Sequence, residues 1–209
     1  MKFENTEVFG LARSIYSARN AMDSWEKSDS DLKNNIIGEK DMELAKKLIK
    51  GGGPHCKFRR MIHVQVDITA PRYFWSEYDT YKVGTTANSC STMHRLLNTP
   101  KSITLDMFTY DEREEEHTKN TVDRLEELRK LYKHCASQHN NNNVLNDLLH
   151  RAKTILPEGY LQMRTVDLNY ENIANMYRFR KNHRLPEWSH DFVNWVKELP
   201  YADDLIMGG

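Results

Sequence analysis

The spacing of apolar residues predicts a chain built mostly of amphipathic helices. Apolar side chains recur every three or four residues in several segments, which is the period of a helix with one buried face. Six segments show this pattern clearly: 7–22, 40–50, 111–136, 144–156, 169–182 and 186–198. Pro71 suits the first turn of a further, aromatic-rich helix that runs to about Tyr81. Another helix is expected to begin near Ser91.

Two segments have the two-residue period of a strand instead. Apolar and polar residues alternate over 61–69, so this segment is predicted to be a half-buried strand, and 160–167 is predicted to be a second one. The polar segments 23–39 and 82–94 are predicted as loops, and Asn140–Asn143 as a turn. Helices therefore dominate the expected fold, with a small sheet.

Length and charge limit the classes of protein to which the chain can belong. A length of 209 residues favours one domain covering 1–209. Lys+Arg and Asp+Glu both number 30, which argues against a protein that coats nucleic acid or binds membrane surfaces. The three cysteines have unrelated spacings and are expected to be reduced thiols. No run of about 20 apolar residues and no apolar secretion signal are found, so the cytoplasm is the expected compartment.

Two polar groups are candidate ligand-binding sites. Asn169 and Arg180 lie eleven residues apart, so a helix places them on nearly the same face. A guanidinium and an amide together suit a phosphate or a pyrimidine carbonyl, although an Arg that extends from a packed helix to solvent gives the same pattern. The loop 82–94 carries Lys82 and many short polar side chains, which suit an anion or a base edge, and which are also common in ordinary surface loops.

Other chemistries fit the sequence poorly. The histidines and Cys135 lack the spacing of a metal site, and the prediction is that there is none. Gly51-Gly52-Gly53 is not followed by the Gly-Lys-Ser/Thr of a phosphate-binding loop. No nucleophile motif surrounds Cys90 or Ser91.

Several motifs together resemble the flavin-dependent thymidylate synthase family. The segment Gly10–Ser17 resembles the first helix of that family, and Lys47–Gly51 followed by His55 resembles the second. Ala70-Pro71 with its aromatic helix resembles the segment that enters the nucleotide loop. Leu156-Pro157, Asn169, Asn175, Arg180 and Glu187-Trp188 follow the spacing of the family's last quarter. The resemblance covers most of the chain, and 23–39 and 98–140 match only as helix or loop.

The most characteristic family motif, Arg-His-Arg followed by Ser, Asn, Glu, Ser and Arg-Tyr, is altered. The corresponding segment is 81–94, in which Asn88 and Ser91 match and the basic triplet is lost. Arg95 is a candidate for the missing guanidinium. Lys153 stands where the family has an Arg, and Glu171 replaces another Arg. Each charge-assisted hydrogen bond is worth on the order of 1.5–3 kcal/mol, so three losses would weaken anion binding by about thousands-fold unless other groups compensate.

The resemblance implies an α+β fold: a helix-rich single domain with a small, mostly antiparallel sheet. It implies that the protein methylates dUMP to dTMP with reduced FAD and methylenetetrahydrofolate, and that it forms a homotetramer with sites at subunit junctions. It assigns catalysis to Arg180 and Ser91, and binding of dUMP to Arg180, Ser91, Lys153 and Arg95. His55, Lys82, Asn88, Asn169 and Asn175 are the implied FAD ligands, and no polymeric nucleic acid or membrane is an expected partner.

Two alternatives remain open at this point. The altered basic triplet is compatible with a divergent, non-catalytic or retuned protein that still binds a pyrimidine nucleotide. The helix-rich, charge-balanced composition is also compatible with a purely structural interaction protein.

Overall fold

The computed structural model describes residues 1–138 and 141–208, so the predicted turn at 140–143 lies partly outside the described residues. The chain falls into two compact units. Unit 1 comprises Met1–Ile68, Asp79–Asn88 and Thr165–Gly209, and unit 2 comprises Thr69–Tyr78 and Ser89–Arg164. That the whole of 1–209 acts as a single domain stays a prediction.

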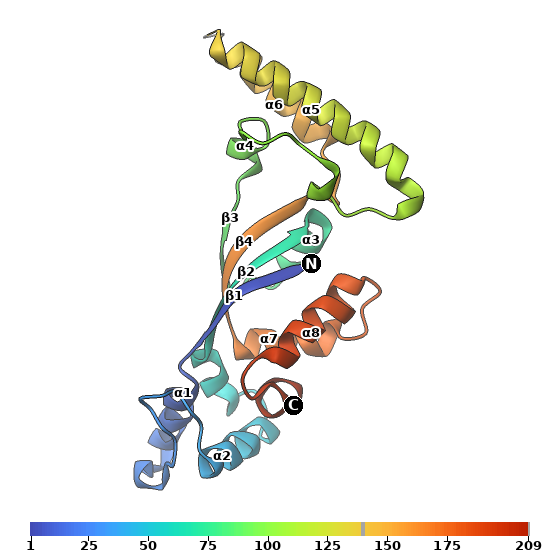
Figure 1. The fold of residues 1–209 in the computed structure, drawn as a ribbon. Coiled ribbons are helices and arrows are strands. Elements are labelled where there is room, and N and C mark those ends of the chain that lie inside the picture. Colours follow the sequence, from blue (N-terminus) through green and yellow to red (C-terminus); the bar gives the residue numbers. More distant parts are fainter. Residues whose placement is uncertain (139–140, 209) are drawn as a thin grey trace. The chain divides into compact units, whose positions relative to one another are not determined.

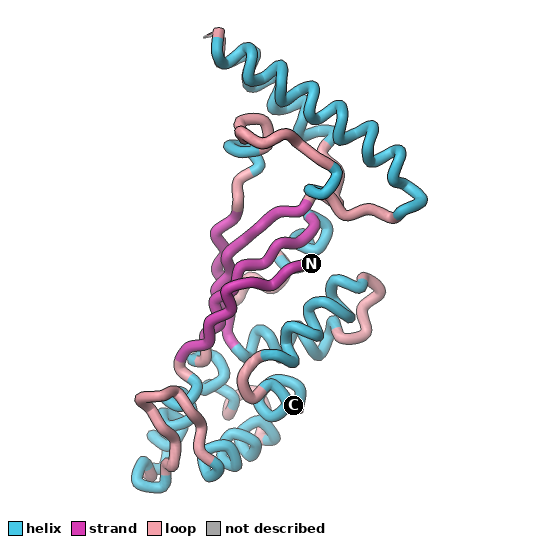
Figure 2. The backbone as a smooth tube through the Cα atoms, in the orientation of Figure 1, coloured by secondary structure: helices cyan, strands magenta, loops and turns pink. Residues whose placement is uncertain are grey.

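The fold is α+β, as predicted, with many helices and a small antiparallel sheet (Figures 1 and 2). The strands are β1 (Lys2–Phe9), β2 (His63–Pro71), β3 (Thr86–Ser89) and β4 (Leu161–Asn169), paired in the order β1-β2-β4-β3. The α-helices are α1 (Leu11–Ala18), α2 (Glu39–Lys50), α3 (Arg72–Tyr78), α4 (Thr92–Arg95), α5 (Glu115–Ser137), α6 (Asn142–Ile155), α7 (Tyr170–Arg180) and α8 (Val193–Glu198).

Short helical turns link these elements. Those of 3₁₀ type among the described residues are η1 (Arg19–Met22), η2 (Trp25–Lys27), η3 (Cys56–Met61), η4 (Leu105–Met107) and η5 (Glu112–Glu114). The last two, η6 (Glu187–Phe192) and η7 (Asp203–Met207), are π-helical. The predicted helix at 186–198 is therefore present as η6 followed by α8.

Two sequence predictions were wrong at the sheet. The predicted helix over 7–22 begins only at Leu11, because residues 2–9 pair with β2 as strand β1 and Gly10 turns the chain in a left-handed conformation. The predicted loop 82–94 contains strand β3. All four residues of β3 are exposed, so no apolar alternation marked it in the sequence.

The predicted alternation in β2 is confirmed in unit 1. Val64 and Val66 are buried, whereas His63 and Gln65 are exposed. On the exposed side, Asp167 of β4 accepts hydrogen bonds from His63 Nδ1 at 2.9 Å and Gln65 Nε2 at 3.0 Å. One step along, Thr165 Oγ1 donates to Asp67 at 2.5 Å. Polar side chains therefore join these two strands across the exposed face of the sheet.

A buried ion pair fixes the start of α2 in unit 1. The Asp41 side chain is fully buried and accepts hydrogen bonds from Arg19 Nε at 2.6 Å and from the hydroxyls of Ser28 and Ser30, both at 2.5 Å. A buried carboxylate requires such partners, because burial removes its hydration. The loop 23–39 is thereby tied to the helix that follows it.

Unit 2 has its own apolar core between the long helices α5 and α6, which lie side by side (Figure 1). Leu125 and Leu128 of α5 and Leu148 and Ala152 of α6 belong to this core. Glu126 of α5 is bound by Arg129 one turn away, with Nε and Nη2 at 2.7 and 2.8 Å from its two oxygens. The same carboxylate accepts the backbone N–H of Ile103 at 2.8 Å, so it holds the preceding segment against the helix.

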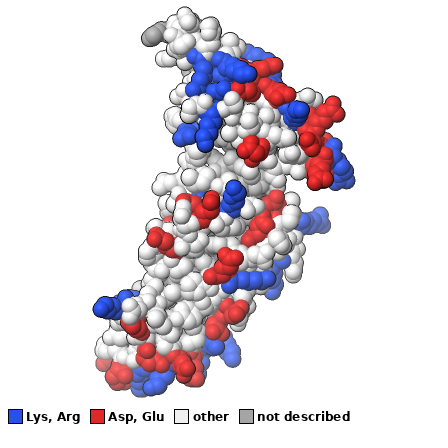
Figure 3. All heavy atoms as spheres, viewed as in Figure 1, with Lys and Arg blue, Asp and Glu red and all other residues white. Residues whose placement is uncertain are grey.

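Charged side chains of both signs are interspersed on the visible face (Figure 3), in line with the balanced composition. Across 1–138 and 141–208, no helix has the length and apolar character needed to cross a membrane.

Candidate functional site

Helix α7 presents its polar residues on two different faces. Asn169 is the residue before the helix, and its side chain accepts the backbone N–H of Asn172 at 3.0 Å, while Asn172 Oδ1 accepts the N–H of Asn169 at 3.2 Å. This reciprocal capping satisfies backbone groups that every helix start leaves unpaired. Asn169 is 6% exposed, so its amide is used within the fold.

Arg180, at the other end of α7, is held by two aromatic rings. Its Nε donates to the hydroxyl of Tyr81 at 2.9 Å. Its guanidinium carbon lies 5.5 Å from the centre of the Tyr81 ring and 5.0 Å from that of Trp188. Aromatic faces attract a cation and fix its plane, so Arg180 is pre-positioned rather than extended into solvent.

The start of the polar loop packs on the same helix. Asn172 Nδ2 donates to the carbonyl of Val83 at 2.7 Å. Gly84 has φ +76°, and a Cβ there would lie 3.1 Å from Nδ2 of the Asn169 side chain. Only glycine adopts this conformation at such close approach without strain, so Gly84 allows the loop to reach α7. Tyr81, Val83 and Gly84 thereby bring the loop to both ends of the helix.

Unit 2 gathers three of the predicted substrate ligands. Lys153 Nζ donates to Thr92 Oγ1 at 2.6 Å, and Thr92 directly follows Ser91. The backbone N–H of Arg95 donates to the carbonyl of Ser91 at 3.0 Å in the short helix α4. Burial, and next the positive charge of Arg72, lower the pKa of Lys153. Lys153 and Arg72 are therefore neighbouring cations in unit 2.

The other predicted residues are more exposed. Lys82, Asn88 and His55 are all exposed, and His55 lies just before η3 with its ring close to Gly51. Asn175 is also exposed on α7. It lies five residues before Arg180, which is about 140° around a regular helix, so the two side chains occupy different faces. Asn169 lies before the helix in an extended conformation, so its side chain caps the start of α7, whereas Arg180 binds Tyr81 at the other end.

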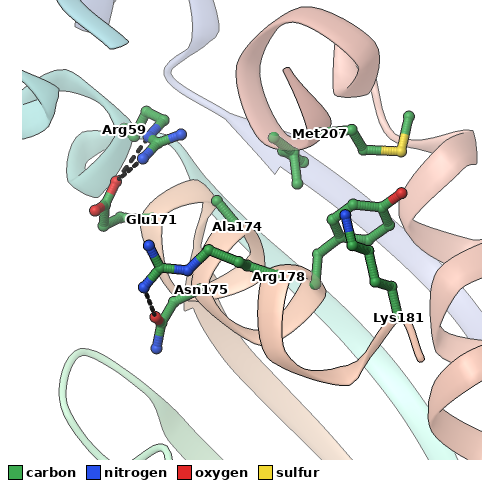
Figure 4. Close-up of a pocket in the computed structure, with 9 residues that line it drawn as sticks. Arg59, Glu171, Ala174, Asn175, Arg178, Lys181 and Met207 are labelled. Carbon is green, nitrogen blue, oxygen red and sulfur yellow. Dashed lines mark hydrogen bonds and ion pairs between the residues drawn. The ribbon is translucent and has the colours of Figure 1, made fainter. Parts of the chain in front are cut away.

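A pocket of about 110 Å³ opens on the Asn175 face (Figure 4). Arg59, Glu171 and Arg178 lie around Asn175, and Lys181 and Met207 lie at the other end. Ala174, Tyr177 and Ile206 complete its lining. Arg59 Nε and Nη2 approach one oxygen of Glu171 at 2.7 and 2.6 Å.

The sequence alone predicted neither the aromatic contacts of Arg180 nor the ion pair between Arg59 and Glu171. The aromatic-rich helix was predicted to end at about Tyr81, but α3 ends at Tyr78, and Tyr81 instead accepts a hydrogen bond from Arg180, 99 positions away. The Arg59–Glu171 pair spans 112 positions. The one available signal was the change of Arg to Glu at 171, since a new carboxylate on a helix requires a cation nearby. The described residues contain no cluster of three or more His, Cys, Asp or Glu side chains that could hold a metal ion.

The fold was compared with known proteins. No family model matches the sequence, and no curated protein matches it either. Among solved structures, a flavin-dependent thymidylate synthase ThyX from Helicobacter pylori, complexed with FAD and dUMP, aligns with a TM-score of 0.73 over 98% of both chains at 19% identity. The chain has the fold of flavin-dependent thymidylate synthases. A second ThyX structure from the same organism, also with FAD and dUMP, aligns with a TM-score of 0.70 over 100% of this chain and 98% of the other, at 20% identity.

At this identity the likeness shows the fold alone. The predicted resemblance to flavin-dependent thymidylate synthases is confirmed at that level. The roles assigned to individual side chains stay predictions.

Proposed function

We propose that this protein binds FAD and a pyrimidine nucleotide and methylates dUMP to dTMP with reduced FAD and methylenetetrahydrofolate. The observation that carries the proposal is the placement of Arg180. In a fold shared over nearly its full length with a protein complexed with FAD and dUMP, this guanidinium is oriented by Tyr81 and Trp188. We further propose a homotetramer that acts in the cytoplasm.

Different residues of the chain would contact the nucleotide ring and its phosphate. Arg180 would donate to a carbonyl oxygen of the uracil ring, where a fixed cation withdraws electron density from the carbon that is alkylated. Ser91, Lys153 and Arg95 would hold the phosphate, because a hydroxyl and two cations complement a dianion. The pKa of Lys153 is lowered, so its amine loses its positive charge at a lower pH than an ordinary lysine does. This contact should therefore weaken at alkaline pH.

The proposed FAD ligands fit the cofactor in part. His55, Lys82, Asn88 and Asn175 are exposed and offer donors for phosphate or ring atoms. Asn169 already caps α7, so its role would be to position the loop at Gly84 next to the cofactor. When bound, reduced FAD supplies the hydride of this reaction, and the protein supplies position and polarity.

The experiment that tests the proposal is direct. Purified protein is examined for the visible absorbance of flavin, and FAD is titrated into it while quenching of flavin fluorescence is followed. Formation of dTMP from dUMP, methylenetetrahydrofolate and a chemical reductant is then measured. Arg180→Lys should lower turnover and leave FAD uptake unchanged, with Arg184→Lys as an exposed control. Absence of FAD binding in both optical and calorimetric titrations would refute the proposal.

A second candidate function is supported by a separate observation. Glu171 places a carboxylate on α7, and the basic triplet is absent from 81–83. Both changes reduce attraction for phosphates, which favours a protein that binds a nucleotide without turnover. In that case dUMP should raise the melting temperature in the absence of FAD, and no dTMP should form. Measurable turnover would exclude this alternative.

A further inference from the structure

A second pocket in unit 1 lies beside strand β1, the loop 34–36 and the segment that follows α8. Its volume is about 700 Å³, which is in the range of sites for small organic ligands. Its lining is mostly apolar and includes the side chains of Leu11, Ile36, Trp195 and Leu199. None of the described residues that line it is a predicted ligand of FAD or dUMP, so its occupancy does not depend on the proposed function.

Two residues in the left-handed conformation fix the walls of this pocket. Asn35 has φ +58°, and its side chain accepts the backbone N–H of Ala12 at 3.2 Å and donates to the carbonyl of Val8 at 3.3 Å. Tyr201 has φ +57°, which is rare for a bulky residue, and its hydroxyl accepts the N–H of Ile37 at 3.2 Å. The pocket is therefore preformed, which lowers the entropic cost of binding a ligand.

An ordered aromatic ring lies next to an exposed apolar side chain in the lining. The Trp195 ring stacks on Phe3 with the ring centres 4.8 Å apart, and its Nε1 donates to Thr6 Oγ1 at 3.1 Å. Ile36 lines the same pocket and is 52% exposed. A ligand that covers Ile36 removes apolar surface from water, which favours binding of an apolar body.

The charge at the pocket is negative. Among the described residues that line it, Glu198 alone carries a charge at neutral pH. Its side chain is exposed, and no ion pair joins it to another described residue. The helical run formed by η6 and α8 ends at Glu198, so the partial negative charge of a helix C-terminus adds to that of the carboxylate. Both charges favour a cation.

We propose that this pocket binds a small organic ammonium ion, with its apolar body against Trp195 and Ile36 and its ammonium group at Glu198. The rings of Trp195 and Tyr201 add to the attraction, because aromatic rings attract cations. A neutral ligand of the same shape would partly dehydrate the carboxylate without pairing it, and an anion would be repelled. The pocket should therefore select its ligand by charge.

The test uses the full chain and three probes that share a phenyl ring on a short chain. Phenethylamine is positive at neutral pH, 2-phenylethanol is neutral and 3-phenylpropionate is negative. Binding is followed by nuclear magnetic resonance titration of the indole N–H signals, and the Trp195 signal is assigned from its absence in Trp195→Phe. Phenethylamine should shift this signal and bind about tenfold more tightly than 2-phenylethanol, and 3-phenylpropionate should leave the signal unchanged.

Two variants separate the charge from the apolar lining, and both substituted residues are exposed, so the fold should be retained. Glu198→Gln should bring phenethylamine to within about twofold of 2-phenylethanol. Glu26→Gln is the matched control, since Glu26 is exposed and does not line the pocket, and it should change neither affinity. Ile36→Ser should weaken both probes by about fivefold, because it removes apolar surface from the site.

Three results would each overturn the proposal. They are equal binding of phenethylamine and 2-phenylethanol by the wild type, unchanged affinity for phenethylamine in Glu198→Gln, and a phenethylamine titration that leaves the Trp195 signal in place. FAD uptake is measured on the wild-type protein without the probes, so failure of the proposed function is seen separately.

Discussion

Replacing Glu126 with Gln is expected to destabilise the protein by roughly 3 kcal/mol at neutral pH and by much less in acid. The hydrogen bonds from Arg129, against the opposing effect of burial, lower the pKa of Glu126 from 4.5 to about 2. The backbone N–H of Ile103 adds to the same shift. The side chain is 14% exposed, so solvent screens these interactions weakly.

The magnitude follows from the change in proton affinity on folding. Each pKa unit corresponds to about 1.36 kcal/mol, and a shift from 4.5 to about 2 therefore gives roughly 3 kcal/mol. Two charge-assisted hydrogen bonds from one guanidinium, at about 1.5–3 kcal/mol each, are consistent with this value.

The sign of the pH dependence is fixed because the folded-state pKa is the lower one. The unfolded chain binds the proton more tightly, so the stabilisation is complete above about pH 4.5 and disappears as the pH falls through about 2. At pH 3 about 1.4 kcal/mol should remain.

The assay is urea unfolding followed by circular dichroism at pH 7, 5 and 3, for the wild type and Glu126→Gln. Glu127→Gln is the matched control, because Glu127 is the next residue of α5 and makes an exposed ion pair with Arg124, which contributes little. A difference between Glu126→Gln and wild type that stays constant from pH 7 to pH 3 would refute the reasoning.

Three further outcomes are expected. Asp41→Asn should cost about 3–5 kcal/mol, because it leaves the buried Arg19 without its carboxylate, and urea unfolding should show Asp123→Asn, an exposed control, to be nearly neutral. Asn169→Ala should cost about 1 kcal/mol and speed hydrogen exchange at the start of α7, while Asn169→Asp should retain the cap. Arg180→Lys should lower dTMP formation by about tenfold or more, since an ammonium cannot reproduce the planar stacking, and unchanged turnover would contradict the role of Arg180.

The sequence was sufficient for most helices and for β2, because their apolar spacing directly reflects one buried face. Strand β1 escaped prediction because most of its residues are exposed, so its place in the sheet depends on backbone pairing with β2. The start of α7 was correctly placed near Asn169, although the reciprocal bonds with Asn172 were not foreseen. Asn at a helix start is a common cap, which gave a local signal that could have been used.

The candidate site was harder to predict than the fold. The spacing of eleven residues predicted that Asn169 and Arg180 share a helix face, but Asn169 lies before the helix with extended backbone and its amide caps α7. The Tyr81 partner and the Arg59–Glu171 pair depend on contacts between residues about a hundred positions apart, which periodicity does not encode. The resemblance to a known family supplied the proposed roles, and these await experiment.

The polar contacts between β2 and β4 solve a problem of alignment. Apolar side chains repeat every second residue along a strand, so a shift of one strand by two positions would still place apolar side chains on the buried face. The contacts of Asp167 with His63 and Gln65, and of Thr165 with Asp67, are lost in any such slide. The polar contacts on the exposed face of the sheet therefore select one strand register among those that would bury the same apolar side chains.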